Sequence, residues 1–304
     1  MIQSGIFTGY FPYGLKETAE KIRGLNFNTV QLDLTFKDMN LSTPEAITKD
    51  KCRKIGETFR DHNLPICCVS GYTNIVHPDR DERKRRLDHL KAIIRHARDL
   101  GSPYVISETG TFATDSDWVS HPKNKTEEGF ADCVKVIREL VQVAYDHGAV
   151  FLLETYVNNV IGSLEETLRV FAEINNSSLG LLMDPTNYFE AHNFGDMDGV
   201  LNRIFDAVAD KIRIAHAKDV KLAGADKSEK HAQLFDGAAE SHTFRGVGQI
   251  ELPAPGLGGL NYDLYLKRLS EHHPNIPIII EHLDESDVPR AKKFIDGKLR
   301  ALGV

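Results

Sequence analysis

The chain of 304 residues lacks the features that mark several classes of protein. No CxxC pair occurs and cysteines are few, so we interpret the thiols as reduced and the protein as cytoplasmic. No apolar run approaches the roughly 20 residues that cross a membrane. The first residues, MIQSGIFTGYFPYG, lack the charged and apolar regions of a signal peptide. We therefore expect neither a disulfide scaffold nor a membrane protein.

An excess of positive charge is also missing. The 37 lysines and arginines stand against 44 aspartates and glutamates, which gives a formal net charge of −7. Nucleic-acid-binding surfaces are normally basic, so we expect no nucleic-acid partner. The charge run RDERKRR at 80–86 mixes both signs and is interpreted as the solvated start of a helix. No GxGxxG follows a strand-like run, which argues against a dinucleotide-binding domain.

Eight short apolar runs alternate with amphipathic segments along the chain. The runs are SGIFTGY (4–10), TVQLDL (29–34), PICCVSG (65–71), PYVISET (103–109), AVFLLETY (149–156), LGLLMD (179–184), KIRIAH (211–216) and IPIIIEH, which contains Glu281. Strict alternation of strands and helices predicts a parallel sheet, and continuous apolar runs are expected of strands covered on both faces. We therefore predict one (β/α)₈ TIM barrel domain over residues 1–304, with extra length after the fourth and seventh strands. A doubly wound open sheet is the alternative.

Capping patterns predict where two of the helices begin. The segment Thr43–Pro44–Glu45 predicts a helix start, and that helix should run to about His62. Ser163 and Glu166 fit the S-x-x-E capping box and predict a helix with Leu164, Leu168 and Phe171 on its inward face. Both helices fall between predicted strands, as a barrel requires.

Four metal-capable side chains close the last four apolar runs. They are Glu154, Asp184, His216 and Glu281. The carboxyl ends of the strands of a parallel barrel meet at one rim, so these side chains should converge. Three carboxylates that converge without a counter-ion would repel one another and shift their pKa values. The sequence therefore predicts one divalent-metal site on four adjacent strands, with a ligand set that suits Mn²⁺, Co²⁺, Mg²⁺ or Zn²⁺.

The segments around these residues resemble the xylose-isomerase-like superfamily of TIM barrels. That superfamily includes ketose 3-epimerases, hydroxypyruvate isomerases, inosose dehydratases and apurinic endonucleases of the endonuclease IV type. The likeness covers nearly the whole chain and is strongest in LLETY around Glu154, GLLMDPTNYF around Asp184, AHAKD around His216, PGLGGLNY at 255–262 and IIIEH around Glu281. The resemblance implies a metal-dependent isomerase or epimerase of a small sugar or keto-polyol, and homo-oligomers that pair through the barrel helices.

The resemblance also implies roles for the four strand-end residues. In the epimerase branch the two matching glutamates bind the ion and move protons, so Glu154 and Glu281 would be both ligands and the acid/base pair. Asp184 and His216 would be ligands only. The expected path is polarisation of the sugar carbonyl, removal of the neighbouring proton to give a cis-enediolate, and reprotonation. An inosose-dehydratase-type lyase, which passes through the same enediolate, and an endonuclease IV-like metal phosphodiesterase are the alternatives.

Two positions depart from the endonuclease pattern. Asn187 stands three residues after Asp184, where the epimerases and endonucleases usually carry histidine. Glu108 stands at the end of the fourth strand, where the endonucleases have histidine. The set needed for three zinc ions is therefore incomplete, which favours one ion and sugar chemistry over DNA repair.

Further residues at the predicted rim are candidates for contact with a sugar. The candidates are His77, Glu108, Asn187, Lys218 and Arg245. Loops at the carboxyl ends of barrel strands commonly carry function. Lys218 completes the His-x-Lys-Asp run typical of the family, and pairing with a rim carboxylate or a solvated loop position are its alternatives. Arg245 lies in the long segment after the seventh strand, from which related enzymes send an arginine to the substrate.

Overall fold

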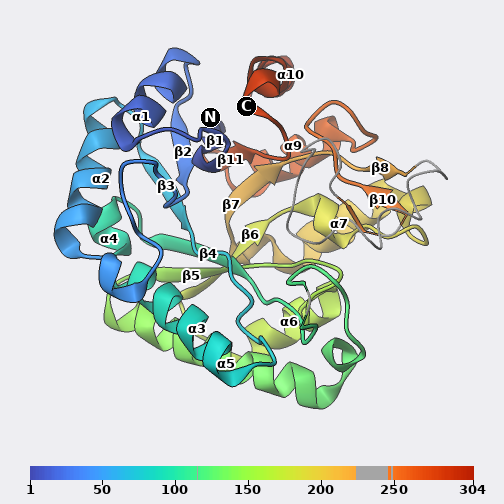
Figure 1. Cartoon of the computed structure of the whole chain (residues 1–304). Helices are drawn as coiled ribbons and strands as arrows, with labels where there is room; N and C mark the ends of the chain where they lie inside the picture. The colour runs from blue at the N-terminus through green and yellow to red at the C-terminus, as the bar shows by residue number, and fades with distance from the viewer. Residues whose placement is uncertain (115, 224–245, 248) are drawn as a thin grey trace.

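Eight parallel strands close into a barrel in the computed structural model, which describes residues 1–114, 116–223, 246–247 and 249–304 (Figure 1). The barrel strands are β1 (Gln3–Phe7), β2 (Thr29–Leu32), β3 (Ile66–Ser70), β4 (Tyr104–Glu108), β5 (Val150–Glu154), β6 (Leu179–Met183), β7 (Ile212–Ala217) and β11 (Pro277–Ile280). Their order around the barrel is β1, β11, β7, β6, β5, β4, β3, β2. The predicted single (β/α)₈ barrel is therefore confirmed.

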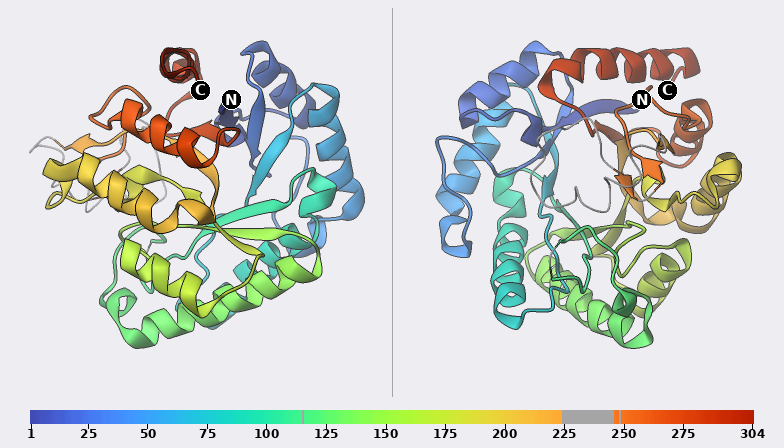
Figure 2. Two further views of the ribbon diagram at one scale, coloured as in Figure 1. Left: turned by 180° about the vertical axis from the view of Figure 1, so that it is seen from behind. Right: turned by 45° about the vertical axis from the view of Figure 1, so that its right-hand side comes forward.

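Helices surround the strands on the outside of the barrel (Figure 2). They are α1 (Leu15–Gly24), α2 (Lys49–Asp61), α3 (Arg80–Arg95), α4 (Ala97–Leu100), α5 (Glu127–Asp146), α6 (Leu164–Glu173), α7 (Met197–Val208), α9 (Tyr262–His272) and α10 (Val288–Leu302). A small antiparallel sheet follows β7 and consists of β8 (Lys221–Leu222), β10 (Ile250–Glu251) and β9 (Gly246–Val247). No helix in the described ranges is long and apolar enough to span a membrane.

Two layers of apolar side chains explain why the runs form strands. The inner layer fills the barrel with one residue from each of six strands: Cys68, Ile106, Leu152, Leu182, Ile214 and Ile279. Alternate residues such as Val69 and Leu153 point outward and belong to the larger core that includes residues of the helices. Because both strand faces are buried, the strands are continuous apolar runs in the sequence.

The predicted start of the second helix is wrong by about one turn and a half. Thr43 accepts a hydrogen bond from the Ala46 amide and caps only the short 3-10 turn Pro44–Ala46. The helix itself begins at Lys49, where the Thr48 side chain accepts a hydrogen bond from the Lys51 amide. Both threonines are good N-cap residues, so the local sequence contains two valid start signals.

The capping box of α6 is confirmed, but its inward face differs from the prediction. The Ser163 side chain binds the Glu166 amide, and the Glu166 side chain binds the Ser163 amide. Leu168 is 41% exposed, whereas Thr167 and Val170 are fully buried. Leu164 and Phe171 are partly buried and pack against the core as predicted, so the predicted face is wrong at Leu168 alone.

Candidate metal centre

The four strand-end residues converge at the carboxyl-terminal rim, as predicted. Each lies two residues after a member of the inner apolar layer, and side chains of a strand alternate with period two. The next inward-pointing position on β5, β6, β7 and β11 is thus Glu154, Asp184, His216 and Glu281. These strands are consecutive around the barrel. The inner layer forms an apolar floor under the cluster.

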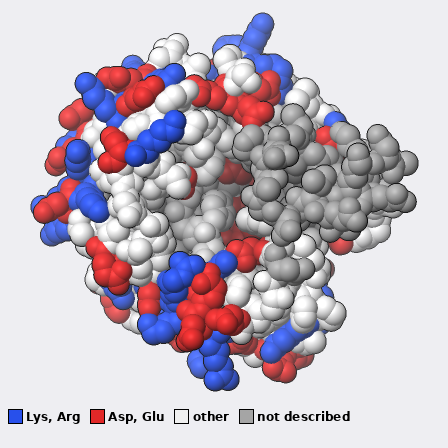
Figure 3. Space-filling view, viewed as in Figure 1, with Lys and Arg blue, Asp and Glu red and all other residues white. Residues whose placement is uncertain are grey.

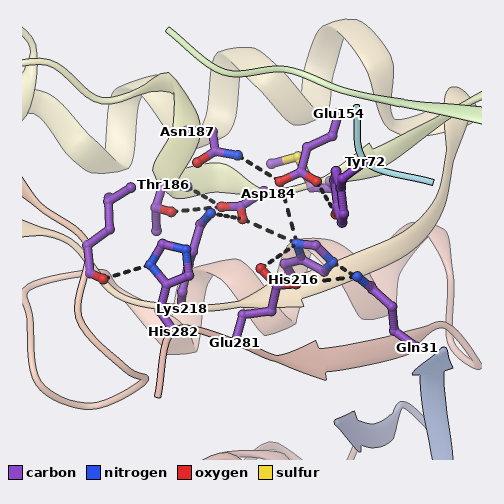
Figure 4. A network of polar contacts seen from close by, with 12 residues as sticks. Gln31, Tyr72, Glu154, Asp184, Thr186, Asn187, His216, Lys218, Glu281 and His282 are labelled. Carbon is purple, nitrogen blue, oxygen red and sulfur yellow. Dashed lines mark hydrogen bonds and ion pairs between the residues drawn. The ribbon is translucent and has the colours of Figure 1, made fainter. Parts of the chain in front are cut away.

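The imidazole of His216 lies at the centre of this cluster (Figure 4). Its Nδ1 atom is 3.6 Å from Glu154 Oε1, 3.4 Å from Asp184 Oδ2 and 3.3 Å from Glu281 Oε2. All four side chains are nearly or completely buried, with Glu281 the most exposed at 8%. Three carboxylates therefore face one ring nitrogen away from solvent.

The other ring nitrogen is held by Gln31, which fixes the imidazole tautomer. His216 Nε2 donates a hydrogen bond to Gln31 Oε1 at 2.8 Å. The Gln31 amide group in turn donates to Ser70 Oγ at 3.2 Å and to Glu281 Oε1 at 3.4 Å. In the neutral ring, with its proton on Nε2, the Nδ1 atom would carry a lone pair directed at the carboxylates. Metal-binding histidines are usually oriented by such a partner on the second nitrogen.

The surroundings of His216 Nδ1 show whether a metal ion fits this site. Within the described part of the chain, Nδ1 is buried and has no hydrogen-bond partner. Ligand atoms of three of the four predicted ligands, Glu154, Asp184 and His216, all lie within 4.8 Å of one another, and Glu281 is not in this group. A buried nitrogen lone pair surrounded by carboxylate oxygens is a set that a divalent cation satisfies. The residues therefore fit a metal ion, and their chemistry does not select among Mn²⁺, Co²⁺, Mg²⁺ and Zn²⁺.

The charges of the cluster also fit a divalent cation. Lys218 is buried, and its Nζ atom lies 2.8 Å from Asp184 Oδ2. With His216 neutral, three ionised carboxylates and this ammonium would leave two negative charges, which a divalent cation would balance. Burial opposes charge on His216, but the carboxylates of Glu281 and Glu154 outweigh it and raise the pKa of this imidazole to about 10. The raised pKa shows that the potential at the ring attracts positive charge.

Asp184 and Glu281 respond to this environment in opposite directions. Burial alone would raise the pKa of Asp184, but the Lys218 ammonium and the His216 ring hold it below its ordinary value. Burial raises the pKa of Glu281, and the positive charges nearby only partly offset it. Asp184 therefore remains ionised, whereas Glu281 is the carboxylate more readily protonated.

Glu154 is positioned by two donors from other strands. The Tyr72 hydroxyl donates to Glu154 Oε2, and Asn187 Nδ2 donates to Glu154 Oε1 at 2.8 Å. Because the amide nitrogen is committed to Glu154, Asn187 Oδ1 points elsewhere. It is buried and has no partner among the described residues. Asn187 thus offers one unused acceptor beside the cluster.

Glu108 is the remaining acidic residue of this rim. It ends β4 in register with Glu154 on β5 and is 9% exposed. Burial, and next the nearby Glu154 carboxylate, raise the pKa of Glu108 well above its ordinary value. Glu108 is therefore protonated more readily than an ordinary glutamate, and in its protonated form it can donate a hydrogen bond.

The other two predicted contact residues, His77 and Arg245, have no described contact with the cluster. His77 Nδ1 accepts a hydrogen bond from the Asp79 amide at 3.2 Å, which stabilises the turn before α3. Arg245 lies outside the described residues. Lys218, Asn187 and Glu108 are the predicted contact residues that do lie at the rim beside Glu154 and Asp184.

Gln31 and Tyr72 belong to this site but were not predicted from the sequence. A signal for Gln31 exists, because an amide in the middle of the apolar run TVQLDL requires a buried partner. Tyr72 has no comparable signal. Its hydrogen bond to Glu154 joins residues that are 82 positions apart, and only the closure of the barrel brings them together.

A closed barrel with a histidine and carboxylates at its carboxyl-terminal rim defines a (β/α)₈ protein with a candidate metal site. Residues 19–298 match the family model described as xylose isomerase-like TIM barrel. The chain therefore belongs to the xylose isomerase-like TIM barrel family. No curated protein matches the sequence.

Solved structures of similar fold cover almost the whole chain. A D-tagatose 3-epimerase-like protein has a TM-score of 0.71 and 17% identity, with 99% of this chain and 98% of that chain covered. A xylose isomerase domain protein from Planctomyces limnophilus has a TM-score of 0.69 and 18% identity, with the same coverage. The IOLI protein with a binding zinc atom has a TM-score of 0.67 and 16% identity, again covering 99% and 98%. At such identities the likeness shows the fold alone.

Proposed function

We propose that the protein is a divalent-metal-dependent isomerase or epimerase of a small sugar or keto-polyol. The observation that carries this proposal is the buried His216 Nδ1 atom, which faces three carboxylates while Gln31 holds Nε2. Membership of the xylose isomerase-like family supports carbohydrate as the substrate class.

The ligands in this proposal are the four strand-end residues. Glu154, Asp184, His216 and Glu281 would hold one ion, which is Mn²⁺, Co²⁺, Mg²⁺ or Zn²⁺. When bound, such an ion supplies Lewis acidity to a substrate carbonyl and its neighbouring hydroxyl. A phosphodiesterase of the endonuclease type would need further metal ligands, and the position that could add one is occupied by Asn187, whose amide is committed to Glu154.

Glu154 and Glu281 would act as the acid/base pair. They come from the two outer strands of the row β5, β6, β7, β11, with Asp184 and His216 between them. A substrate carbon bound over the row would therefore have a carboxylate on each side. One glutamate removes the proton next to the carbonyl, which gives an enediolate, and the other returns a proton to the opposite face or the adjacent carbon.

Three further side chains would orient the substrate. Asn187 Oδ1 is a buried acceptor without a partner among the described residues, which suits a substrate hydroxyl. Protonated Glu108 would donate to a substrate oxygen. Lys218 holds Asp184 and would place a positive charge near the oxygen that gains negative charge.

The test is a screen of the metal-loaded protein against ketoses, aldoses, inososes and their phosphates in D₂O. Products are read by NMR. Solvent deuterium at a carbon of an intact sugar is the expected result. Loss of water from the product would indicate the dehydratase-type lyase instead, and cleavage of abasic-site DNA with more than one zinc per chain would indicate the phosphodiesterase.

The acid/base roles are tested with Glu154→Gln and Glu281→Gln. Each should lower turnover by about 10²–10⁴-fold, the usual contribution of a positioned proton-transfer group. Glu173→Gln, on the exposed end of α6, is the matched control and should leave turnover unchanged. Full activity in either of the first two variants would contradict the two-glutamate mechanism.

A further inference from the structure

A second cavity lies beside the candidate metal centre, over the other half of the rim. Its volume is about 630 Å³, and it is formed by the chain after β2, the end of β3 and one face of α3. Figure 3 shows a hollow in the face of the molecule seen in Figure 1, with acidic side chains near its floor. None of the four candidate ligands lines the cavity. The cavity is therefore separate from the cluster of candidate ligands.

The cavity is continuous with the metal centre through two residues. Tyr72 lines the cavity, and its hydroxyl donates a hydrogen bond to Glu154. Ser70 also lines it and accepts a hydrogen bond from Gln31, the residue that binds His216. Tyr72 lies beside Glu154 (Figure 4), so a ligand with one end at Glu154 would have Tyr72 between that end and the cavity.

Most of the side-chain surface that the cavity walls leave free to contact a ligand is apolar. Its apolar members are Leu34, Phe36, Met39, Leu41, Leu90 and Ile93. Several polar side chains of the lining already have partners. Arg86 binds Glu82 and Asp117, and His89 Nε2 binds the main-chain carbonyl of Leu41.

This arrangement fits an apolar group better than a second sugar or a phosphate. Hydroxyls and phosphates need free donors and acceptors, because a polar group buried without them costs free energy. Apolar walls need none and gain from the area that they bury. Cavities of about 300–1,000 Å³ typically hold ligands larger than a single small sugar.

We propose that this cavity binds an apolar substituent of the substrate, so that the substrate is an alkyl or aryl glycoside or ether of a sugar. The sugar end of this assignment rests on the function proposed above, whereas the apolar end rests on the cavity. Tyr72 then separates a reacting end at Glu154 from a recognition end between β2 and α3.

The test is calorimetric titration of the metal-loaded full chain with methyl, propyl and hexyl β-D-glucopyranosides. Affinity should rise with chain length, by up to about fourfold for each buried methylene. Met39 is a partly buried wall residue, so Met39→Asp should remove most of this dependence. Leu257→Asp, at a position that is 49% exposed and outside the cavity lining, should preserve it.

The outcomes separate this inference from the proposed function. Equal affinity at all chain lengths, no binding at any length, or an equal dependence in Met39→Asp and wild type would overturn the inference. Deuterium incorporation into free sugars together with a flat series would leave the proposed function standing. A steep series without sugar turnover would refute the proposed function and leave the apolar subsite.

Discussion

At the scale of single residues, the candidate site depends on how one imidazole is held. Gln31 is completely buried, and its carbonyl oxygen accepts a hydrogen bond from His216 Nε2. That contact leaves Nδ1 facing the carboxylates. The orientation of this candidate ligand therefore depends on a residue that is not a candidate ligand itself.

Gln31→Leu should weaken divalent-metal binding by about 10–100-fold, because the His216 ring loses the partner that orients it. The measurement is titration calorimetry with Mn²⁺, Co²⁺ and Zn²⁺ on the metal-free protein. Gln142→Leu is the matched control, since the Gln142 amide binds only an exposed aspartate on its own helix. Unchanged affinity in Gln31→Leu would show that the orientation of His216 does not depend on Gln31.

Lys218 allows a second prediction at this scale. Lys218→Met removes the ammonium that lies 2.8 Å from the buried Asp184 carboxylate. Breaking a buried pair in this way should lower the free energy of unfolding of the metal-free protein by about 3–5 kcal/mol. Divalent metal should recover more stability in the variant than in wild type, because the cluster then carries an additional net negative charge.

Urea unfolding with and without metal measures both effects of the lysine substitution. Lys298→Met is the control, because that lysine pairs with a well exposed Asp263. Such surface pairs contribute only about 0–1 kcal/mol. Equal losses in the two variants would mean that Asp184 has no special dependence on Lys218.

The positions of the site residues could be predicted from the sequence, but their partners could not. Each candidate ligand is a polar residue at the end of an apolar run, which is a local pattern. Gln31 hydrogen-bonds His216, which is 185 positions away in the sequence. Tyr72 hydrogen-bonds Glu154, which is 82 positions away. No local pattern records contacts that arise only when the barrel closes.

At the scale of the elements, the start of α6 is stabilised by reciprocal side-chain caps. Glu166 accepts hydrogen bonds from the amides of both Gly162 and Ser163. Ser163→Ala removes the other half of the box and should lower the free energy of unfolding by about 0.5–2 kcal/mol. Chemical denaturation measures this, with the exposed Ser177→Ala as the control. A loss as small as that of the control would contradict a stabilising role of the cap.

Helix faces were harder to predict than helix positions. Leu164 and Phe171 of α6 pack against the core as predicted. Thr167 is buried and hydrogen-bonds Thr155, whereas Leu168 is exposed. A polar residue with a buried partner thus occupies a position that a hydrophobic pattern would assign to leucine.

At the scale of the whole molecule, the fold was the part most fully predicted. Both faces of every barrel strand are covered, so each strand is a continuous apolar run, and the alternation with helices leaves few topologies. The small sheet β8, β10, β9 was not predicted. Its strands are two residues long, too short to leave a periodic pattern in the sequence.

Burial of ionisable groups throughout the fold predicts sensitivity to alkaline pH. Burial raises the pKa of the Cys52 thiol from 9.0 to about 12 and also raises the pKa values of Cys68 and Cys133. Above pH 9 the unfolded chain therefore loses protons that the folded protein keeps. The free energy of unfolding should fall as pH rises from 9 to 10, by up to about 1.4 kcal/mol per pH unit for each such thiol.

Urea unfolding at pH 8, 9 and 10 tests this dependence. Cys52→Ala should make the decline above pH 9 shallower, because one of the raised thiols is gone. Stability that stays constant or increases over this range would contradict it. Below pH 8 these thiols are protonated in both states and should contribute no slope.

The separation of the rim into two halves has a consequence for redesign. The candidate ligands come from β5, β6, β7 and β11, while the neighbouring cavity is built by the chain around β1, β2, β3 and α3. Loops grafted onto the second half would leave the backbone that carries the ligands untouched. If Gln31, Ser70 and Tyr72 are retained, because they connect the second half to His216 and Glu154, the scaffold would offer directed evolution two sets of positions, one around the candidate ligands and one around the cavity.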